Sequence, residues 1–297
     1  MDELLIVFLA GFVASFVDGS LGMGFGPASS SILLGTGLSP AAVSTTVNLA
    51  KVATGVSSAV SHWKFQNIDR RLVWRLAVPG CVGALIGVTV LASVDGEQLK
   101  PVLTVVLLIM DARILLRFSR ALPVKTDDDA PLDGEPVKVR YDERGTVLAA
   151  TAGGVTNGLV GAWGPVVTTF LLQKGVTPRY AVGSVNTAET AVALVASGSL
   201  LASVGGGGIN LAVVAAMLTG GVLASPVAAW AVRFVPARGL GIAVGGLLFV
   251  TNIRQLSSSF DLGAERWLAY ALVAVACGYA AMRPRLVLRR AAAAAAG

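Results

Sequence analysis

Lys51 is a charged residue in the middle of an apolar stretch, and it has an acidic counterpart later in the chain. It lies in SPAAVSTTVNLAKVATG, which predicts a helix with Ser39 as its cap and Pro40 at its first position. A shift of 138 residues places Lys51 on Glu189. A central charge in a spanning helix costs about 2.5–3.5 kcal/mol on insertion scales. Three explanations are open: Lys51 binds an anion, Glu189 carries a coupling proton, or the two form a structural ion pair.

Polar side chains accompany this pair at helical spacing. Asn48 lies one turn before Lys51, beside Thr45, and the same shift places it on Asn186. Amide and hydroxyl groups can hydrogen-bond to an oxyanion without adding charge. We therefore expect these residues to face a common site.

Two glycine-rich breaks interrupt otherwise apolar segments. GFGP at 24–27 and AWGP at 162–165 each stand between two short apolar pieces, and we expect the second pieces to be half-helices over 28–35 and 166–173. Irregular backbone at membrane depth is tolerated only where it is buried in protein or lines a cavity. Free N–H groups at a half-helix N-terminus suit an anion. The alternative is that glycines and hydroxyls merely allow close helix packing.

These patterns predict a substrate site and no catalytic or metal-ligating set, and no cofactor is expected. Its residues are predicted to be Asn48, Asn186, Lys51, Glu189, Gly26, Pro27, Ser30, Gly164, Pro165, Thr168, Thr45 and Trp163. Asp18, at the first break, is expected to cap the hairpin, with titration as the alternative. One histidine and two distant cysteines leave little from which to build an enzyme active site.

The composition identifies the class of protein that must position these residues. Of 297 residues, 55% are hydrophobic and only 13% are charged, whereas soluble domains carry about 25% charged residues. The net charge of +6 comes mainly from short loops, which is typical of membrane orientation and not of nucleic-acid binding. We expect spanning segments at 41–62, 72–93, 99–117, 180–203, 209–231, 237–256 and 266–283.

An internal repeat organises these segments. Ten of 28 positions from Gly26 to Ala53 are identical after the shift, which predicts two homologous halves. If the second broken segment returns to its own side, 19 Lys/Arg lie on one face of the membrane and 3 on the other. Full crossing would give 13 against 9, so the positive-inside rule favours re-entry from the cytoplasm.

The predicted fold is an all-α polytopic membrane protein with two inverted repeats. Each repeat is a re-entrant broken-helix hairpin plus three transmembrane helices, with an extra C-terminal helix. The predicted units are the first repeat at 1–117, a cytoplasmic linker at 118–144, the second repeat at 145–256, and the C-terminal helix and tail at 257–297. The expected location is the inner (cytoplasmic) membrane, with lipid and a small anion as partners and a homodimer as an open alternative.

The chain resembles the TauE/SafE family of membrane transporters. The resemblance rests on GSLGMGFGP and SPAAVSTTVNLAK, repeated as GAWGP and TPRYAVGSVNTAE, and covers residues 5–285. It implies transport of sulfite, sulfoacetate or a related sulfur-containing anion by alternating access, driven by an ion gradient. The alternatives are a passive anion channel and a transporter of another small organic anion. Phe25 and Trp163 depart from the commoner glycine-rich break of the family.

Overall fold

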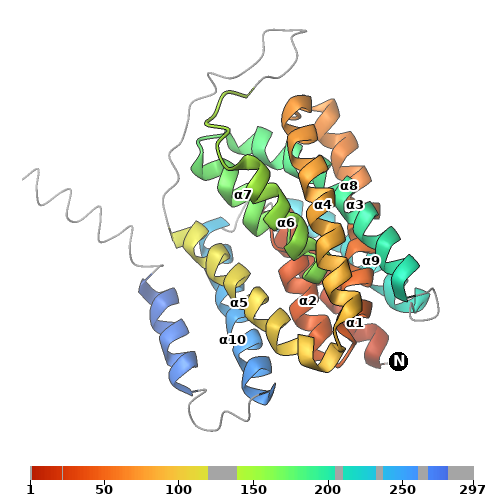
Figure 1. Ribbon diagram of the computed structural model, residues 1–297. Coiled ribbons are helices and arrows are strands. Elements are labelled where there is room, and N and C mark those ends of the chain that lie inside the picture. The colour runs from red at the N-terminus through yellow and green to blue at the C-terminus, as the bar shows by residue number, and fades with distance from the viewer. Residues whose placement is uncertain are drawn as a thin grey trace, which may run out of the picture.

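The computed structural model describes residues 2–21, 23–119, 139–204, 210–231, 237–259 and 267–279, and this part of the chain is helical apart from short connections (Figure 1). The first half contains α1 (Asp2–Leu21), α2 (Phe25–Gly35), α3 (Pro40–Lys64), α4 (Arg70–Ser93) and α5 (Gly96–Ser119). The second half contains α6 (Thr146–Val160), α7 (Gly164–Gln173), α8 (Pro178–Val204), α9 (Leu211–Ala231) and α10 (Ala237–Ser259). A further apolar helix spans Trp267–Tyr279.

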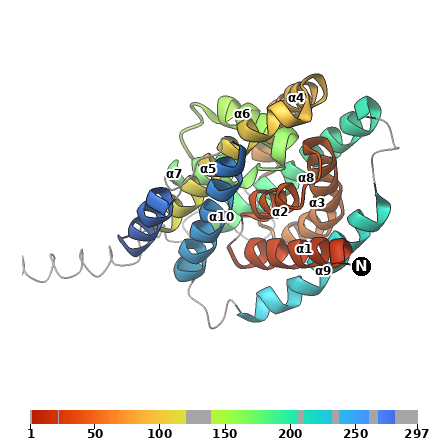
Figure 2. The same ribbon diagram turned by 90° about the horizontal axis from the view of Figure 1, so that it is seen from below.

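The two halves match helix by helix. A shift of 138 residues carries α1 to α5 onto α6 to α10, with boundaries that agree within three residues except at the start of α6, which lies six residues later. The helix contacts match as well, because α4 packs on α6 while α1 packs on α9, and α3 and α5 pack on their own counterparts α8 and α10. Figures 1 and 2 show α1 lying along α9 and α5 lying along α10.

Glycines allow the pairs α4–α6 and α1–α9 to approach closely. A Cβ atom on Gly154 of α6 would lie 2.1 Å from the Gly80 carbonyl oxygen of α4, and one on Gly11 of α1 would lie 2.2 Å from the Met217 carbonyl oxygen of α9. Small residues at such contacts let helix backbones approach and gain van der Waals packing. These two pairs flank the central helices α3 and α8, which carry Lys51 and Glu189.

The half-helices begin earlier than the sequence predicts. α2 starts at Phe25 rather than residue 28, and α7 starts at Gly164 rather than residue 166. The N–H groups in the first turn of a helix have no intrahelical acceptor, so a proline there costs no helical hydrogen bond. Pro27 and Pro165 therefore both fit inside the first turn. The first break therefore ends at Gly24, and the second comprises residues 161–163; Gly24 and Gly161 adopt positive φ angles of 124° and 66°.

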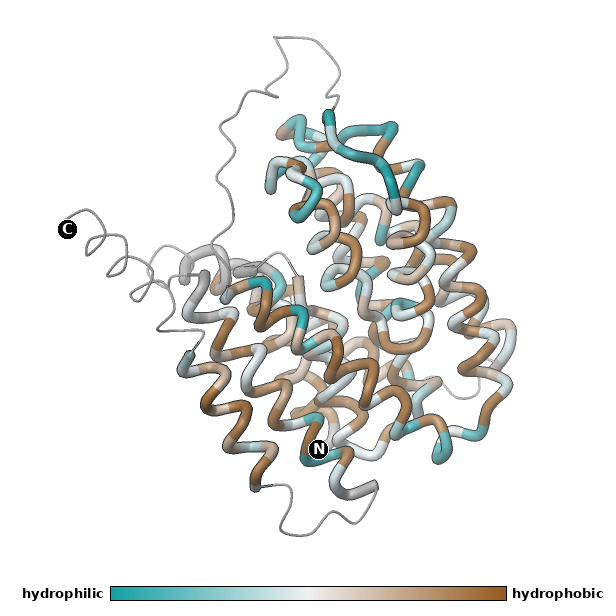
Figure 3. Tube along the Cα trace, turned by 60° about the vertical axis from the view of Figure 1, so that its left-hand side comes forward, coloured by the Kyte–Doolittle hydropathy of each residue, from teal (hydrophilic) through white to brown (hydrophobic). Residues whose placement is uncertain are grey.

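Hydrophobic residues predominate along the helices, whereas hydrophilic residues gather near helix ends and in connections (Figure 3). Among the described helices, Arg70–Ser93 and Pro178–Ser203 are long and apolar enough to cross a membrane on composition alone. The predicted spans 41–62, 99–117 and 237–256 are also helical, but each contains polar or charged residues within it. Among those residues are Lys51 of α3, Asp111 of α5 and Asn252 of α10, which are buried.

A set of ion pairs holds the segment before α6 against neighbouring helix ends. Glu143 pairs with Arg75 of α4, and Asp142 pairs with Lys174 at the end of α7 at 2.6 Å. The hydrogen bond from Arg75 lowers the pKa of the Glu143 carboxyl, and that from Lys174 lowers the pKa of the Asp142 carboxyl. Because Lys174 follows α7 while Asp142 precedes α6, this pair places the end of α7 beside the start of α6.

Candidate functional site

The two breaks meet in the centre of the molecule. A Cβ atom on Gly26 would lie 1.8 Å from the Gly161 carbonyl oxygen, and one on Gly164 would lie 3.3 Å from Cβ of Met23. Only glycine can occupy position 26 without moving the second break, since a Cβ contact under 3.0 Å requires a shift. The irregular segments of both halves therefore form a single central feature.

A small closed cavity lies where the breaks meet. It is lined by Asp18, Met23, Gly24, Phe25, Gly26, Pro27, Lys51, Gly161, Gly164, Pro165, Asn186 and Glu189. The cavity leaves about 10 Å³ for the centre of a water molecule, which is about the space that one water requires. The described conformation is thus closed, with charged side chains and both half-helix N-termini around the enclosed space.

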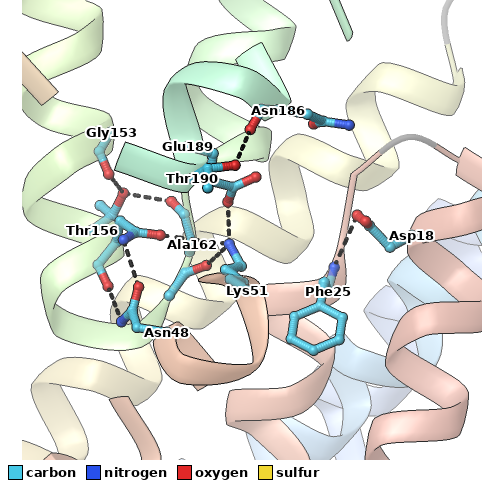
Figure 4. Close-up of polar contacts among 12 residues, drawn as sticks. Asp18, Phe25, Asn48, Lys51, Gly153, Thr156, Ala162, Asn186, Glu189 and Thr190 are labelled. Carbon is cyan, nitrogen blue, oxygen red and sulfur yellow. Dashed lines mark hydrogen bonds and ion pairs between the residues drawn. The ribbon is translucent and has the colours of Figure 1, made fainter. Parts of the chain in front are cut away.

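Lys51 and Glu189 form a largely buried ion pair in this cavity (Figure 4). Their side chains are 8% and 17% exposed. Lys51 Nζ also donates to the Gly161 carbonyl oxygen at 2.6 Å and to Asn157 Oδ1 at 3.5 Å. An ammonium group has three donors, so all of them are engaged. The two residues occupy equivalent positions of the repeat, so the pair joins the two halves at the cavity.

Side chains from the first half satisfy the carbonyl groups at the end of α6. The last turn of an α-helix leaves carbonyl oxygens without intrahelical donors. Here Ser30 donates to the Val160 carbonyl at 2.6 Å and Ser44 to the Gly158 carbonyl at 2.7 Å. Lys51 donates a hydrogen bond to the Gly161 carbonyl oxygen, and its positive charge is favourable at the negative end of the α6 dipole. These polar side chains therefore allow a helix to end inside an apolar interior.

Asn48 belongs to this cap and lies outside the cavity lining. Its Nδ2 donates to the carbonyl oxygens of Ser44 at 2.9 Å and Asn157 at 3.2 Å, while its Oδ1 accepts from Asn157 Nδ2 at 2.7 Å. Both asparagines are fully buried. The amide of Asn48 is thus satisfied by protein groups in this conformation.

Hydrogen bonds cross each break from equivalent positions. In the first break Asp18 Oδ1 accepts from the Phe25 N–H at 3.4 Å, as the expected capping contact requires. In the second break Thr156, the counterpart of Asp18, donates to the Ala162 carbonyl at 2.6 Å. Figure 4 shows Asp18 and Thr156 on opposite sides of the Lys51–Glu189 pair. At the first break the carboxylate of Asp18 therefore lines the cavity, whereas at the second break the hydroxyl of Thr156 binds the backbone of the break itself.

The structure brings together seven of the twelve predicted site residues. Those lining the cavity are Lys51, Glu189, Asn186, Gly26, Pro27, Gly164 and Pro165. The other five are buried outside its lining: Asn48, Ser30, Thr45, Thr168 and Trp163. Thr45 donates to the Ala41 carbonyl of its own helix at 2.7 Å.

Trp163 fills space between helices. Its indole ring is fully buried, and it packs so closely on Gly80 of α4 that a Cβ there would lie 2.5 Å from the ring. Its Nε1 and the hydroxyl of Thr168 have no partner among the described residues. The large ring at the second break therefore packs α4 and α6, while Phe25 is the ring that borders the cavity.

Several site residues have no strong signal in the sequence. Asn157 is the main partner of Asn48, but its repeat counterpart is Gly19, so the repeat gives no indication of its role. Gly161 adopts a left-handed conformation, and its carbonyl oxygen accepts a hydrogen bond from Lys51. The only sequence signal for this role is that the residue is glycine. Arg113 of α5 donates to the Pro165 carbonyl at 3.0 Å and was outside the predicted set.

Comparison with known proteins identifies the family of this chain. The family model described as sulfite exporter TauE/SafE matches residues 7–254. The chain is 36% identical over 258 residues to the probable membrane transporter protein YtnM of Bacillus subtilis (strain 168), covering 86% of this chain and 83% of that protein. It is 30% identical over 108 residues to a probable membrane transporter protein of Haemophilus influenzae (strain ATCC 51907 / DSM 11121 / KW20 / Rd), covering 36% and 42%. No solved structure matches. The chain therefore belongs to the TauE/SafE family of membrane transporters.

Proposed function

We propose that the protein is a secondary transporter of a small sulfur-containing anion, such as sulfite or an organosulfonate, that works by alternating access. The observation that carries this proposal is the closed central cavity containing the Lys51–Glu189 pair and both half-helix N-termini. Helix N-termini offer backbone N–H groups and a positive dipole end to an anion. The substrate class is taken from the family description.

An anion reaches Lys51 only by replacing Glu189. All three ammonium donors are engaged, and two of them hold the second break in place. Glu189 is the anionic partner, and its departure leaves the contacts of Lys51 with the Gly161 carbonyl and the Asn157 side chain intact. We therefore propose that the anion takes the place of the Glu189 carboxylate on Lys51.

The charges around the cavity favour coupling to protons. Lys51 is the cation in the lining, whereas Asp18 and Glu189 are both carboxylates. An added anion would raise the negative charge of a site that solvent hardly screens. Protonation of Glu189 as it leaves Lys51 removes one negative charge, so proton and anion would bind together. A proton gradient would then drive the anion.

The inverted arrangement of the halves is part of the proposal. We propose the units 1–117, 118–144, 145–256 and 257–297, with the end of α7 on the cytoplasmic side of the cell membrane and the end of α2 on the other side. Gly35 and Gln173 are exposed counterparts at these two ends. In a background with Cys81 and Cys277 replaced by serine, G35C should react with a membrane-impermeant thiol reagent from outside and Q173C only from inside. Labelling of both from the same side would contradict the inversion.

Flux into proteoliposomes tests the function. Purified protein should exchange at least one of sulfite, sulfoacetate and thiosulfate with saturation, and a pH gradient should drive its accumulation. Empty liposomes and K51M protein serve as controls. An ohmic current without saturation would indicate a passive channel, and absence of flux or binding across a broad panel of anions would refute the substrate claim.

A further inference from the structure

A second buried carboxyl group lies away from the cavity, between α2, α5 and α10. Asp111 of α5 is fully buried, and its Oδ2 accepts from Asn252 Nδ2 of α10 at 2.7 Å. The same Nδ2 donates to Ser31 Oγ of α2 at 2.8 Å. Asn252 and Ser31 are also fully buried. A single amide thus joins the carboxyl group to the first half-helix.

The cluster of Asp111, Asn252 and Ser31 contains acceptor atoms for which there is no donor. Asp111 Oδ1 and Asn252 Oδ1 have no donor among the described residues. A carboxylate accepts at both oxygens and an amide oxygen accepts too, so the cluster lacks donors and not acceptors. A buried polar atom left without a partner is unfavourable, because it has given up its hydrogen bonds to water.

No cation in the described part of the chain offsets a negative charge on Asp111. Asp111 has no ion pair there, and α2, α6 and α7 contain no charged residues or histidine. Other charged groups on α5 include Arg113 and Arg117, and those on the helices packed against it include Arg254 of α10 and Lys51 of α3. Arg113 binds carbonyls of α7, Lys51 pairs with Glu189, and the Arg254 side chain is exposed.

We propose that Asp111 carries a proton in the described conformation and forms a second proton site, distinct from the Lys51–Glu189 pair. A proton on the carboxyl removes the uncompensated charge and converts one acceptor into a donor. An ionised carboxylate in this apolar setting would need water or a cation, because burying an unpaired charge is strongly unfavourable. Release of the proton therefore requires the contact between α2, α5 and α10 to open.

Through Asp111 and Arg113, α5 is linked to both half-helices, α2 and α7. Asp111 reaches α2 through Asn252 and Ser31, whereas Arg113, two residues later on α5, binds the carbonyl oxygens of Pro165 and Val166 at 3.0 and 3.5 Å. α5 thus holds one half-helix through a group that titrates and the other through a permanent cation. Deprotonation would release α2 while α7 stays held.

Infrared spectroscopy of reconstituted protein tests the proton directly and needs no transport substrate. At neutral pH the wild type should show the carbonyl band of a protonated carboxylic acid, shifted in D2O. D111N should lose band area equal to one carboxyl group per chain, and the exposed-site control D95N should lose none. D111L provides the same subtraction if D111N does not fold. An unchanged band in D111N and D111L, or a wild-type band that disappears when Na⁺ is added at constant pH, would overturn the proposal.

Hydrogen exchange tests the consequence for α2. In wild-type protein, amide exchange in α2 should rise relative to α7 as the pH is raised and the proton leaves, after correction for intrinsic exchange rates. D111N should lack this relative rise because its side chain stays neutral. An equal rise in D111N and wild type would show that Asp111 does not control α2.

Discussion

Replacing Lys51 with methionine tests whether the central ion pair holds the two breaks together. Methionine keeps much of the apolar stem but removes three donors. Glu189 is then a largely buried carboxylate without its cation, and the Gly161 carbonyl loses a 2.6 Å hydrogen bond. The perturbation therefore separates the charge of the pair from its capping of α6.

The expected cost follows from these two losses. Breaking a buried ion pair by removing one partner costs about 3–5 kcal/mol, whereas exchanging both partners for apolar groups is often close to neutral. We expect K51M to lower the free energy of unfolding by about 3–5 kcal/mol. The double variant K51M/E189M loses the buried charge but keeps the unsatisfied Gly161 carbonyl, so we expect a cost of about 1–3 kcal/mol.

Reversible unfolding in mixed micelles measures these values, and K64M supplies the matched control because Lys64 is exposed at the end of α3. The double variant should be more stable than K51M by about 2 kcal/mol, because it no longer buries an unpaired carboxylate. If K51M differs from wild type by less than about 1 kcal/mol, or if the double variant is less stable than K51M, the pair does not hold the breaks as described.

Three further predictions concern the surroundings of the pair. N48L should destabilise the protein by about 2–4 kcal/mol because it strands polar groups of Asn157, each worth about 1–3 kcal/mol, whereas N186L should impair transport with little change in unfolding. G26A should lower the free energy of unfolding by at least about 1–3 kcal/mol, because it forces a Cβ atom against the Gly161 carbonyl. G35A is the matched control and should be tolerated, because nothing lies within 4 Å of a Cβ atom there. Equal stabilities of the two variants would contradict the close contact at Gly26. The lowered pKa values of Asp142 and Glu143 mean that their pairs stabilise the 139–145 segment above the ordinary carboxyl pKa of about 4 and lose this effect as the pH falls through the lowered values. Proteolysis of that segment should therefore accelerate at acid pH, and E143Q should already be cleaved faster at neutral pH.

Much of the architecture could be predicted from the sequence because the two halves repeat with a constant offset. The offset places Lys51 on Glu189, and these two residues do meet. The helix boundaries follow the same offset closely, since both copies share the proline and glycine signals that begin and end helices. The orientation of the halves in the membrane stays a prediction.

The roles of individual polar residues could not be predicted in the same way. Asn48 and Ser30 have the residue types of a binding site, yet in this conformation they satisfy the end of α6, a need that arises only once α6 stops inside the protein. Asp111 and Asn252 lie far apart in the sequence, and their repeat counterparts, Phe249 and Ile114, are apolar. Neither the repeat nor a local motif connects them, so only the packing of α5 on α10 brings them together.

The most direct test of the central claim is counterflow of radiolabelled sulfite in proteoliposomes containing wild-type, E189Q or K51M protein, with and without a pH gradient. Glutamine resembles the protonated acid, so E189Q should retain counterflow but lose its acceleration by the gradient. K51M that is shown to be folded should lose both. Wild-type rates in folded K51M, or unchanged gradient dependence in E189Q, would contradict the exchange of Glu189 for the anion on Lys51.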